Sequence, residues 1–345
     1  APSNMALYAR SSVQLPPDVD PTKATLAFGD RALPRLCREL QGPELLTRQR
    51  ALMALCDLVH EPEMAYEAVR VGCLECLRSL LVDEDATVRC KTTEALSIMV
   101  SHSIVRTMFL SMDLILPLSH LFDDDVDICR LNTHKTLEML SEIPHGALGI
   151  VEAGLVPCLV KKLRSELNEI CELILDTLNF CLAVDTMQAL EVGAVDVLLT
   201  LLLHESERIR AKAARATMNI TVSLEGKNQA CDKQLVPVLV GLLSDSSTDV
   251  RGNAAGAIMT IAVTTQGKYA ALGAEAVHPL VELVTDGRSE VRLNAIKAIT
   301  ALAEAPEGRE ALLPSVSLLG GCRSDASAAV ANAVHIALQV ITWRP

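Results

Sequence analysis

Small and apolar residues recur along this chain with the spacing of one face of an α-helix. Counted from a position that is usually arginine, offsets three and six are mostly small, and offsets seven and ten are mostly larger and aliphatic. One copy, residues 250–262, reads VRGNAAGAIMTIA. Offsets of three, six, seven and ten lie on one helical face. The pattern therefore predicts a helix that approaches its neighbours closely through small side chains.

The same helix returns at a nearly fixed interval of about 41 residues. Its reference position is occupied eight times, by Arg48, Arg89, Arg130, Cys171, Arg210, Arg251, Arg292 and Ala331. A repeat of this length is the signature of a helical solenoid, in which each unit buries its apolar face against the next. The sequence therefore predicts an all-α fold with almost no strand.

Two further helices precede the arginine helix in each unit. One has a proline near its start, at Pro34, Pro117, Pro157, Pro237 and Pro279, and is expected over ranges such as 195–203, 236–243 and 277–284. Proline suits the first turn of a helix. The other opens with Glu-Gly-Lys or a close variant, with glycine at Gly226, Gly267 and Gly308. We expect these glycines to take the left-handed conformation between two helices. Each unit is then a short helix followed by two longer ones.

Three helices in about 40 residues, with a Val-Arg pair and this core pattern, resemble the armadillo repeat. The resemblance implies a right-handed superhelix whose third helices line a concave groove. We count about eight repeats, and predict a flexible arm at residues 1–20 and a single armadillo-repeat solenoid at 21–345, whose opening helix starts at Asp20 and Pro21. The eighth copy is degraded, with Gly320 and Gly321 inside its second helix.

Composition excludes several classes of function. The net charge of −12 and the lack of a basic stripe with interleaved aromatics argue against a nucleic-acid partner. No run of 18 apolar residues exists, so no membrane partner is expected. Acidic residues cluster before the third helices, as at residues 83–85 and 123–125. We interpret them as compensation for helix N-termini; a role with a metal or a tubulin tail is the alternative.

Cysteine and histidine positions give no sign of catalysis. The eleven cysteines lack a disulfide spacing, and Cys56, Cys171 and Cys181 fall on packing faces, which predicts buried thiols in a reducing compartment. Cys73 and Cys76 form a lone C-x-x-C, interpreted as two core-facing positions, with a zinc site as the alternative. The eight histidines are dispersed, and no nucleophile or phosphate-binding motif occurs. We therefore predict no enzyme, no cofactor, no metal and no small-molecule substrate.

The side of the third helix beside its core face is the candidate binding surface. An apolar row is predicted at offset nine by Ile98, Met139 and Phe180, unless these residues pack against a neighbouring repeat. Arg50, Lys91 and Lys135 flank the row and could pair with carboxylates of a partner. Armadillo proteins of nuclear import repeat an asparagine at offset nine, and only Asn219 matches here. An import-receptor mechanism is therefore disfavoured.

Several stretches match more than the generic repeat. They lie at 16–24, 45–58, 263–272, 303–309 and 343–345, and read PPDVDPTKA, LLTRQRALMALCDL, VTTQGKYAAL, AEAPEGR and WRP. They are similar to the radial spoke head 14 homologues, an armadillo-repeat family. The resemblance implies a structural component of the radial spoke, in the cytoplasm and cytoskeleton at the axoneme of a motile cilium or flagellum. Its partners would be other radial spoke proteins. The alternative is a soluble adaptor that holds an extended peptide or helix of a partner in its groove.

Overall fold

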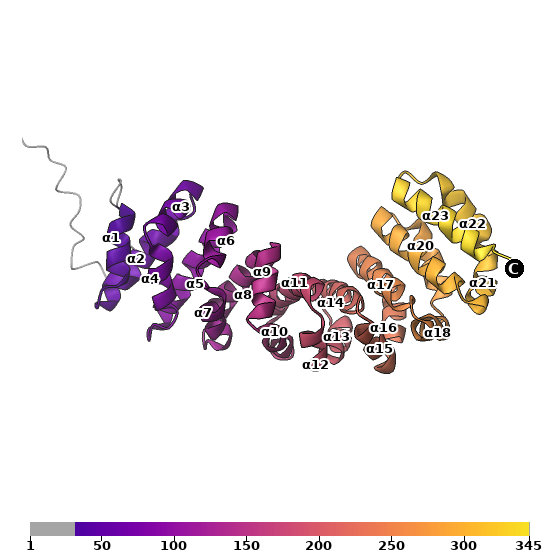
Figure 1. Cartoon of the computed structure of the whole chain (residues 1–345), viewed down its shortest axis with the longest axis horizontal. Helices are drawn as coiled ribbons and strands as arrows, with labels where there is room; N and C mark the ends of the chain where they lie inside the picture. Colours follow the sequence, from indigo (N-terminus) through magenta and orange to yellow (C-terminus); the bar gives the residue numbers. More distant parts are fainter. Residues whose placement is uncertain (1–31, 345) are drawn as a thin grey trace, which may run out of the picture. The chain divides into compact units, whose positions relative to one another are not determined.

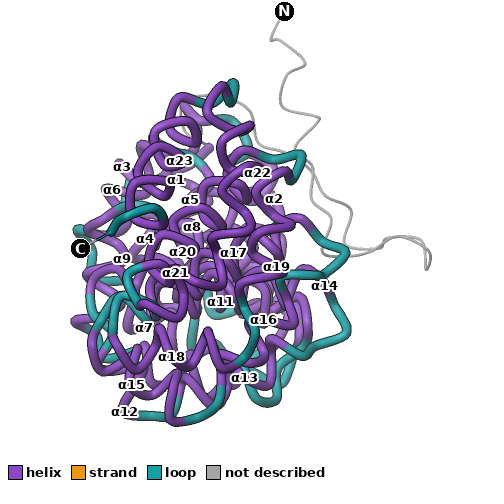
Figure 2. The backbone as a smooth tube through the Cα atoms, turned by 90° about the vertical axis from the view of Figure 1, so that its right-hand side faces the viewer, coloured by secondary structure: helices purple, strands orange, loops and turns teal. Residues whose placement is uncertain are grey.

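The computed structural model describes residues 32–344, and every regular element in that range is a helix (Figure 2). The predicted arm at 1–20 and the helix start at Asp20 and Pro21 lie outside the described residues. Contacts divide the chain into unit 1, which ends at Ala153, and unit 2, which begins at Gly154. The two units are described separately below, and a single solenoid over 21–345 stays a prediction.

Unit 1 is built from short first and second helices and long third helices (Figure 1). Its helices are α1 (Ala32–Leu40), α2 (Leu45–Leu58), α3 (Pro62–Arg70), α4 (Cys73–Leu80), α5 (Ala86–Ser101), α6 (Ser103–Leu110), α7 (Ile115–Ser119), the 3-10 turn η2 (His120–Asp123), α8 (Asp127–Ser141) and α9 (Pro144–Glu152). The third helices α2, α5 and α8 stack side by side in sequence order.

Unit 2 continues the same order of elements from a second helix onward (Figure 1). Its helices are α10 (Val156–Lys162), α11 (Asn168–Val184), α12 (Met187–Glu191), α13 (Ala194–Leu202), α14 (Glu207–Ile220), α15 (Leu224–Asp232), α16 (Leu235–Leu242), α17 (Thr248–Ile261), α18 (Thr265–Gly273), α19 (Val277–Glu282), η3 (Leu283–Thr285), α20 (Ser289–Ala303), α21 (Pro306–Leu312), η4 (Leu313–Ser315), α22 (Val316–Gly321), η5 (Cys322–Ser324) and α23 (Ala328–Ile341). Here α11, α14, α17, α20 and α23 stack as third helices.

The core face predicted for the third helix is confirmed in all eight copies within the described residues. Side chains at offsets three, six, seven and ten are buried, apart from Leu58 in the first copy, which is half-buried. Small residues such as Ala254 and Ala257 lie fully buried in α17, which packs between α14 and α20. Close approach of helix axes requires small side chains at the contact, and the larger offsets fill the space that remains.

The recurring arginine joins one repeat to the next. Arg251 Nη1 donates to the carbonyl oxygens of Asp245 (2.9 Å) and Ser246 (3.0 Å), in the loop before its own helix. Its Nη2 lies 2.7 Å from Oδ2 of Asp286, in the loop of the following repeat. The same arrangement pairs Arg48 with Asp83, Arg89 with Asp124, Arg210 with Asp245, and Arg292 with Asp325. We call this set the arginine–aspartate ladder. It runs within unit 1 and within unit 2.

The ladder explains why the loop before each third helix is acidic and non-helical. Asp286 Oδ1 also accepts a hydrogen bond from the backbone amide of Arg288, at 2.9 Å. The loop must present two carbonyl oxygens to the arginine, so its chain cannot continue the second helix. The second helices accordingly have five to nine residues, like the first helices, against 14 to 17 for the third. The expectation of two longer helices per unit was wrong for the second helix.

The glycines of the Glu-Gly-Lys motif are not in the left-handed conformation. Gly226, Gly267 and Gly308 lie in the first turn of α15, α18 and α21. A Cβ on each would come within 2.0 Å of a carbonyl oxygen at the end of the preceding third helix, such as Ile261 O for Gly267. Glycine is therefore needed because the first helix starts directly against the third helix, and not because of its backbone angle.

The left-handed position lies instead at the turn between the first and second helices. It is occupied by Gly72, Asp113, Gly154, Gly193, Gln234 and Glu275, with φ between 50° and 89°. Three of the six are glycine, which adopts this conformation without steric cost. The other three carry a Cβ at the same place in the repeat, and this obscures the position in the sequence.

The cysteines are mostly buried free thiols, as predicted, with one exception. Cys56, Cys171 and Cys181 are buried and unbridged, and burial raises the pKa of Cys56 and Cys181 to about 12 and that of Cys171 to about 11. Cys37 and Cys73, however, form a disulfide between α1 and α4. Stacking of successive second helices brings these two residues together, with Cα atoms 5.5 Å apart, which no sequence spacing indicated. Cys73 and Cys76 both face the core, as expected.

Candidate functional site: the third-helix faces

The five candidate residues of unit 1 lie on its third helices. Ile98 on α5 and Met139 on α8 are partly exposed rather than buried in the core. Arg50 lies on α2, Lys91 on α5 and Lys135 on α8. Lys91 pairs with Glu94 of its own helix at 2.6 Å. Lys135 is exposed and has no ion-pair partner within the described residues.

Phe180 and Asn219 belong to unit 2. Phe180 on α11 is partly exposed. A continuous row from Ile98 to Phe180 spans both units and therefore stays a prediction. Asn219 on α14 uses its side-chain amide inside the repeat: Nδ2 donates to Oδ1 of Asn179 at 2.6 Å and to the Asn179 carbonyl at 3.1 Å. Asn219 thus ties α14 to α11.

Four adjacent third helices of unit 2 form a face that sequence reasoning did not single out. We call the exposed side of α14, α17, α20 and α23, which presents Arg215, Lys297 and Ile336, the basic face. Acidic residues occur in these helices only within the first turn, at Glu207, Asp249 and Glu290, and α23 has none. Arg215 on α14 and Lys297 on α20 are exposed, and neither has a hydrogen-bond or ion-pair partner within residues 32–344.

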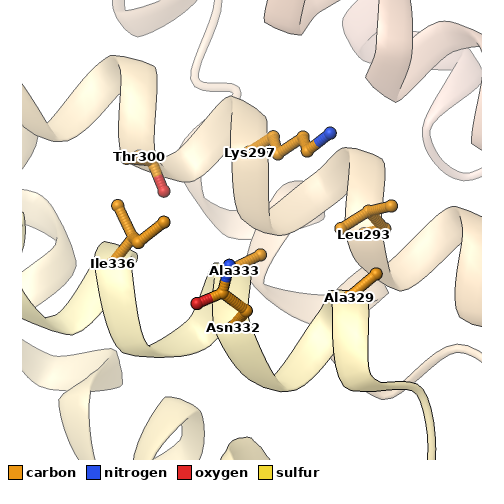
Figure 3. A pocket seen from close by; sticks show the side chains of 7 residues that line it. All are labelled: Leu293, Lys297, Thr300, Ala329, Asn332, Ala333 and Ile336. Carbon is orange, nitrogen blue, oxygen red and sulfur yellow. The ribbon is translucent and has the colours of Figure 1, made fainter.

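A cleft of about 300 Å³ opens on the basic face between α20 and α23 (Figure 3). Leu293, Lys297 and Thr300 line it from α20, and Ala329, Asn332, Ala333 and Ile336 line it from α23. Ile336 is 45% exposed. The lining combines apolar surface with one hydroxyl, one amide and one ammonium group, so it can take an apolar group with a polar group beside it.

The packing between these helices is tight and fixes the face. A Cβ on Gly256 of α17 would lie 2.5 Å from Sδ of Met218 and 3.2 Å from Nδ2 of Asn294. Asn253 and Asn294 each donate Nδ2 to a backbone carbonyl of the preceding third helix, Ala211 O and Gly252 O, both at 3.0 Å. The exposed groups therefore stand on helices that are joined by close packing and by side-chain hydrogen bonds to backbone.

Among residues 32–344, no three His, Cys, Asp or Glu side chains gather in a way that could hold a metal ion. His134 is fully buried and stacks on Phe122 with ring centroids 4.6 Å apart. Over the same range, no single helix is long and apolar enough to cross a membrane; one bent pair, Ser103–Leu110 with Ile115–Asp123, meets the criteria only jointly.

Comparison with known proteins identifies the fold. A HEAT repeat profile matches residues 235–264, which span α16 and α17. A crystal structure described as an engineered protein superposes with a TM-score of 0.84 at 24% identity, over 90% of this chain and 79% of the other. This chain has the armadillo-type solenoid fold. The predicted fold class is therefore confirmed.

Two designed armadillo repeat proteins also match. One superposes with a TM-score of 0.62 at 24% identity, over 66% of this chain and 99% of its own. A second, in complex with the peptide (KR)4, gives a TM-score of 0.61 at 24% identity, again over 66% and 99%. These matches, like the engineered protein, concern the fold of the repeat.

Proposed function

We propose that this chain is a non-enzymatic scaffold that binds other proteins through its third-helix faces. The observation that carries the proposal is the basic face of unit 2, where exposed polar and apolar groups lie on closely stacked helices. A designed armadillo repeat protein binds a peptide. Solenoids generally use such extended surfaces to hold partners.

We further propose that the scaffold belongs to the radial spoke of motile cilia, in the cytoskeleton of the axoneme, and that its partners are other radial spoke proteins. Support comes from the similarity to the radial spoke head 14 homologues. Two stretches that carry this similarity meet in space: Arg309 of AEAPEGR lies over the ring of Trp343 of WRP, 5.2 Å from its centroid. A contact between two separate matching segments gives both a shared structural role.

Permanence of attachment separates this proposal from a soluble adaptor. We expect the protein to remain with axonemes that have been stripped with detergent and washed with salt, and to co-sediment with radial spoke proteins. The measurement is quantitative mass spectrometry of the washed pellet and of the extract, with a known soluble ciliary protein as the reference. Complete release with the soluble reference would favour the adaptor that holds an extended peptide or helix.

A further inference from the structure

The basic face of unit 2 has a charge opposite to that of the chain as a whole. The protein carries a net charge of −12, yet four consecutive third helices have no carboxylate beyond their first turn. Those first-turn carboxylates stand at the helix N-termini, where Asp249 and Glu290 both pair with Arg288. A surface of this size without acidic groups is unexpected in so acidic a chain.

The cations of the basic face differ from those at its border. Arg208 and Lys212, at the N-terminal end of α14, face acidic residues of α11: Arg208 Nε lies 3.1 Å from Glu172, and Lys212 pairs with Asp176. Arg215, one turn further along α14, has no such partner, and neither does Lys297. Their charges are therefore available to an external anion.

Between the two cations, the corresponding position of α17 carries no charge: it is the buried Gly256, beside the side chains of Met218 and Asn294. Offset five is Arg215 in α14, Gly256 in α17 and Lys297 in α20. Because Gly256 has no side chain, no charged group at that offset stands between the two cations. The next helix, α23, has Ile336 at the same offset, on the wall of the cleft in Figure 3.

The spacing indicates how a ligand would reach both cations. Packed helices lie about 8–10 Å apart, so Arg215 and Lys297, two helices apart, are separated by roughly 16–20 Å. An extended chain advances about 3.3 Å per residue and spans that distance in about five or six residues. A third point of contact, the cleft at Ile336, lies about three residues further on.

We propose that the basic face binds an extended acidic segment of a protein partner. Its two carboxylates, about five or six residues apart, pair with Arg215 and Lys297, and an apolar side chain about three residues beyond the second carboxylate enters the cleft between α20 and α23. This inference rests on the proposed scaffold function and names the chemistry of the partner for one of its faces.

A nucleic acid fits this face less well. Phosphate binding draws on many lysines and arginines, and single strands are held by aromatic side chains that stack on bases. The basic face has two unpaired cations, and α14, α17, α20 and α23 contain no Phe, Tyr or Trp. Charge attraction is therefore present without the stacking groups.

The test uses the full chain and a synthetic peptide. A fluorescein-labelled peptide carries two glutamates about six residues apart in a serine and glycine background, with a leucine about three residues after the second glutamate. Binding is followed by fluorescence anisotropy at low salt. We expect saturable binding that weakens at least tenfold when both glutamates become glutamine, and severalfold when the leucine becomes serine.

Matched variants separate the face from general charge effects. Arg215→Glu with Lys297→Glu is expected to abolish binding, and Ile336→Asp to remove the benefit of the leucine. Lys161 on α10 and Arg323 in η5 are exposed and unpaired within the described residues. The control Lys161→Glu with Arg323→Glu makes the same charge change and should leave binding within about twofold. Circular dichroism checks that each variant is folded.

Three results would overturn the inference: no saturable binding, equal weakening by the control pair, or displacement of the peptide by a single-stranded oligonucleotide at lower concentration than by unlabelled peptide. A failure here is distinguishable from a failure of the proposed function. If Arg215→Glu with Lys297→Glu protein still remained with washed axonemes and their spoke proteins while the peptide did not bind, the scaffold role would stand and the acidic partner would not.

Discussion

The recurring arginine shows how one side chain holds two repeats together. Arg251 satisfies two loop carbonyls and pairs with an aspartate that lies 35 residues further along the chain. The guanidinium suits this task because it presents several donors in a fixed plane, which an ammonium does not. The sequence revealed the arginine by its period, but its partners became clear only when successive loops were seen to stack.

Replacing Arg251 by methionine should therefore cost stability. Methionine keeps much of the volume but leaves two carbonyls without their donor and removes the guanidinium that pairs with Asp286. Loss of hydrogen bonds to a charged group typically costs about 1.5–3 kcal/mol. We expect a fall of about 2 kcal/mol in the free energy of unfolding, measured by urea titration. Arg215→Met, at an exposed position without a partner, should change it by less than about 0.5 kcal/mol.

At the left-handed turn positions, a substitution should instead increase stability. Gln234 has φ of 58° at a position where three other repeats have glycine. A non-glycine residue in this conformation is strained by about 1–2 kcal/mol. Gln234→Gly should raise the melting temperature, although the greater freedom of glycine in the unfolded chain offsets part of the gain.

Two matched variants check that the backbone angle is responsible. Gln234→Ala keeps the Cβ and should give no gain. Gly193→Ala introduces a Cβ at φ of 79° and should lower the melting temperature. Stabilisation by Gln234→Ala equal to that by Gln234→Gly would contradict the account.

At the scale of elements, the junction between third and first helices is the tightest point of the repeat. Gly267, in the first turn of α18, lies so close to the end of α17 that a Cβ would lie 2.0 Å from Ile261 O. That overlap is with backbone, so one helix must move. The sequence predicted the glycine's presence and period, but it could not distinguish close approach from a left-handed turn, because both demand glycine.

Gly267→Ala should therefore be strongly destabilising, by about 2–3 kcal/mol or more, as expected for overpacking that shifts backbone. Gly273 provides the control in the same helix. It is the last residue of α18, and a Cβ there would meet nothing within 4 Å. Gly273→Ala should be neutral or slightly stabilising, because alanine favours helix. The measurement is the free energy of unfolding of both variants in urea, and equal values for the two would contradict the close packing.

The elements themselves were largely predictable, and their lengths were not. The buried face of α17 followed from helical periodicity, and the proline rule placed the second helices within a few residues. The second helices end early because the loop that follows each of them contains Asp286 or its equivalent. This loop bonds to the arginine of the preceding third helix and to the arginine of the next one. A pairing between repeats of this kind is not encoded in any local pattern.

At the scale of the whole molecule, the arginine–aspartate ladder makes stability depend on pH. Burial alone would raise the pKa of Asp286, but the Arg288 amide and the Arg251 guanidinium outweigh it and hold the pKa below its ordinary value. The pKa of Asp245 is lowered in the same way, through Arg210 and the Ser247 amide. A carboxylate whose pKa is lower in the folded than in the unfolded protein stabilises the fold at pH values above its unfolded pKa of about 3.9. This stabilisation is lost as the pH falls through the folded-state pKa.

The urea midpoint should therefore be insensitive to these groups between pH 5 and 7 and fall below about pH 4. Asp286→Asn should lower the midpoint at pH 6 and flatten the decline between pH 4 and 2, since one titrating group is gone. Glu310 is exposed and has no partner within the described chain, so Glu310→Gln serves as the control. An unchanged acid limb in Asp286→Asn would show that the ladder does not set acid stability.

The proposed binding surface was the hardest feature to predict. Offset positions on the third helix were identifiable, and Lys135 is exposed. Asn219, however, is hydrogen-bonded to Asn179, and Lys91 forms an ion pair with Glu94. The basic face depends on which cations lack partners in neighbouring helices, as Arg215 and Lys297 do. That distinction requires the stacked structure, because a sequence lists charges without their pairs.

The central claim is that the third-helix faces bind the partner. Hydrogen–deuterium exchange of the full chain, alone and with radial spoke complexes purified from axonemes, tests it most directly. We predict slower exchange in α14, α17, α20 and α23 on binding, with the second helices α10 and α16 unchanged. Protection confined to the first or second helices would contradict the account, as would exchange unaffected by the spoke complexes.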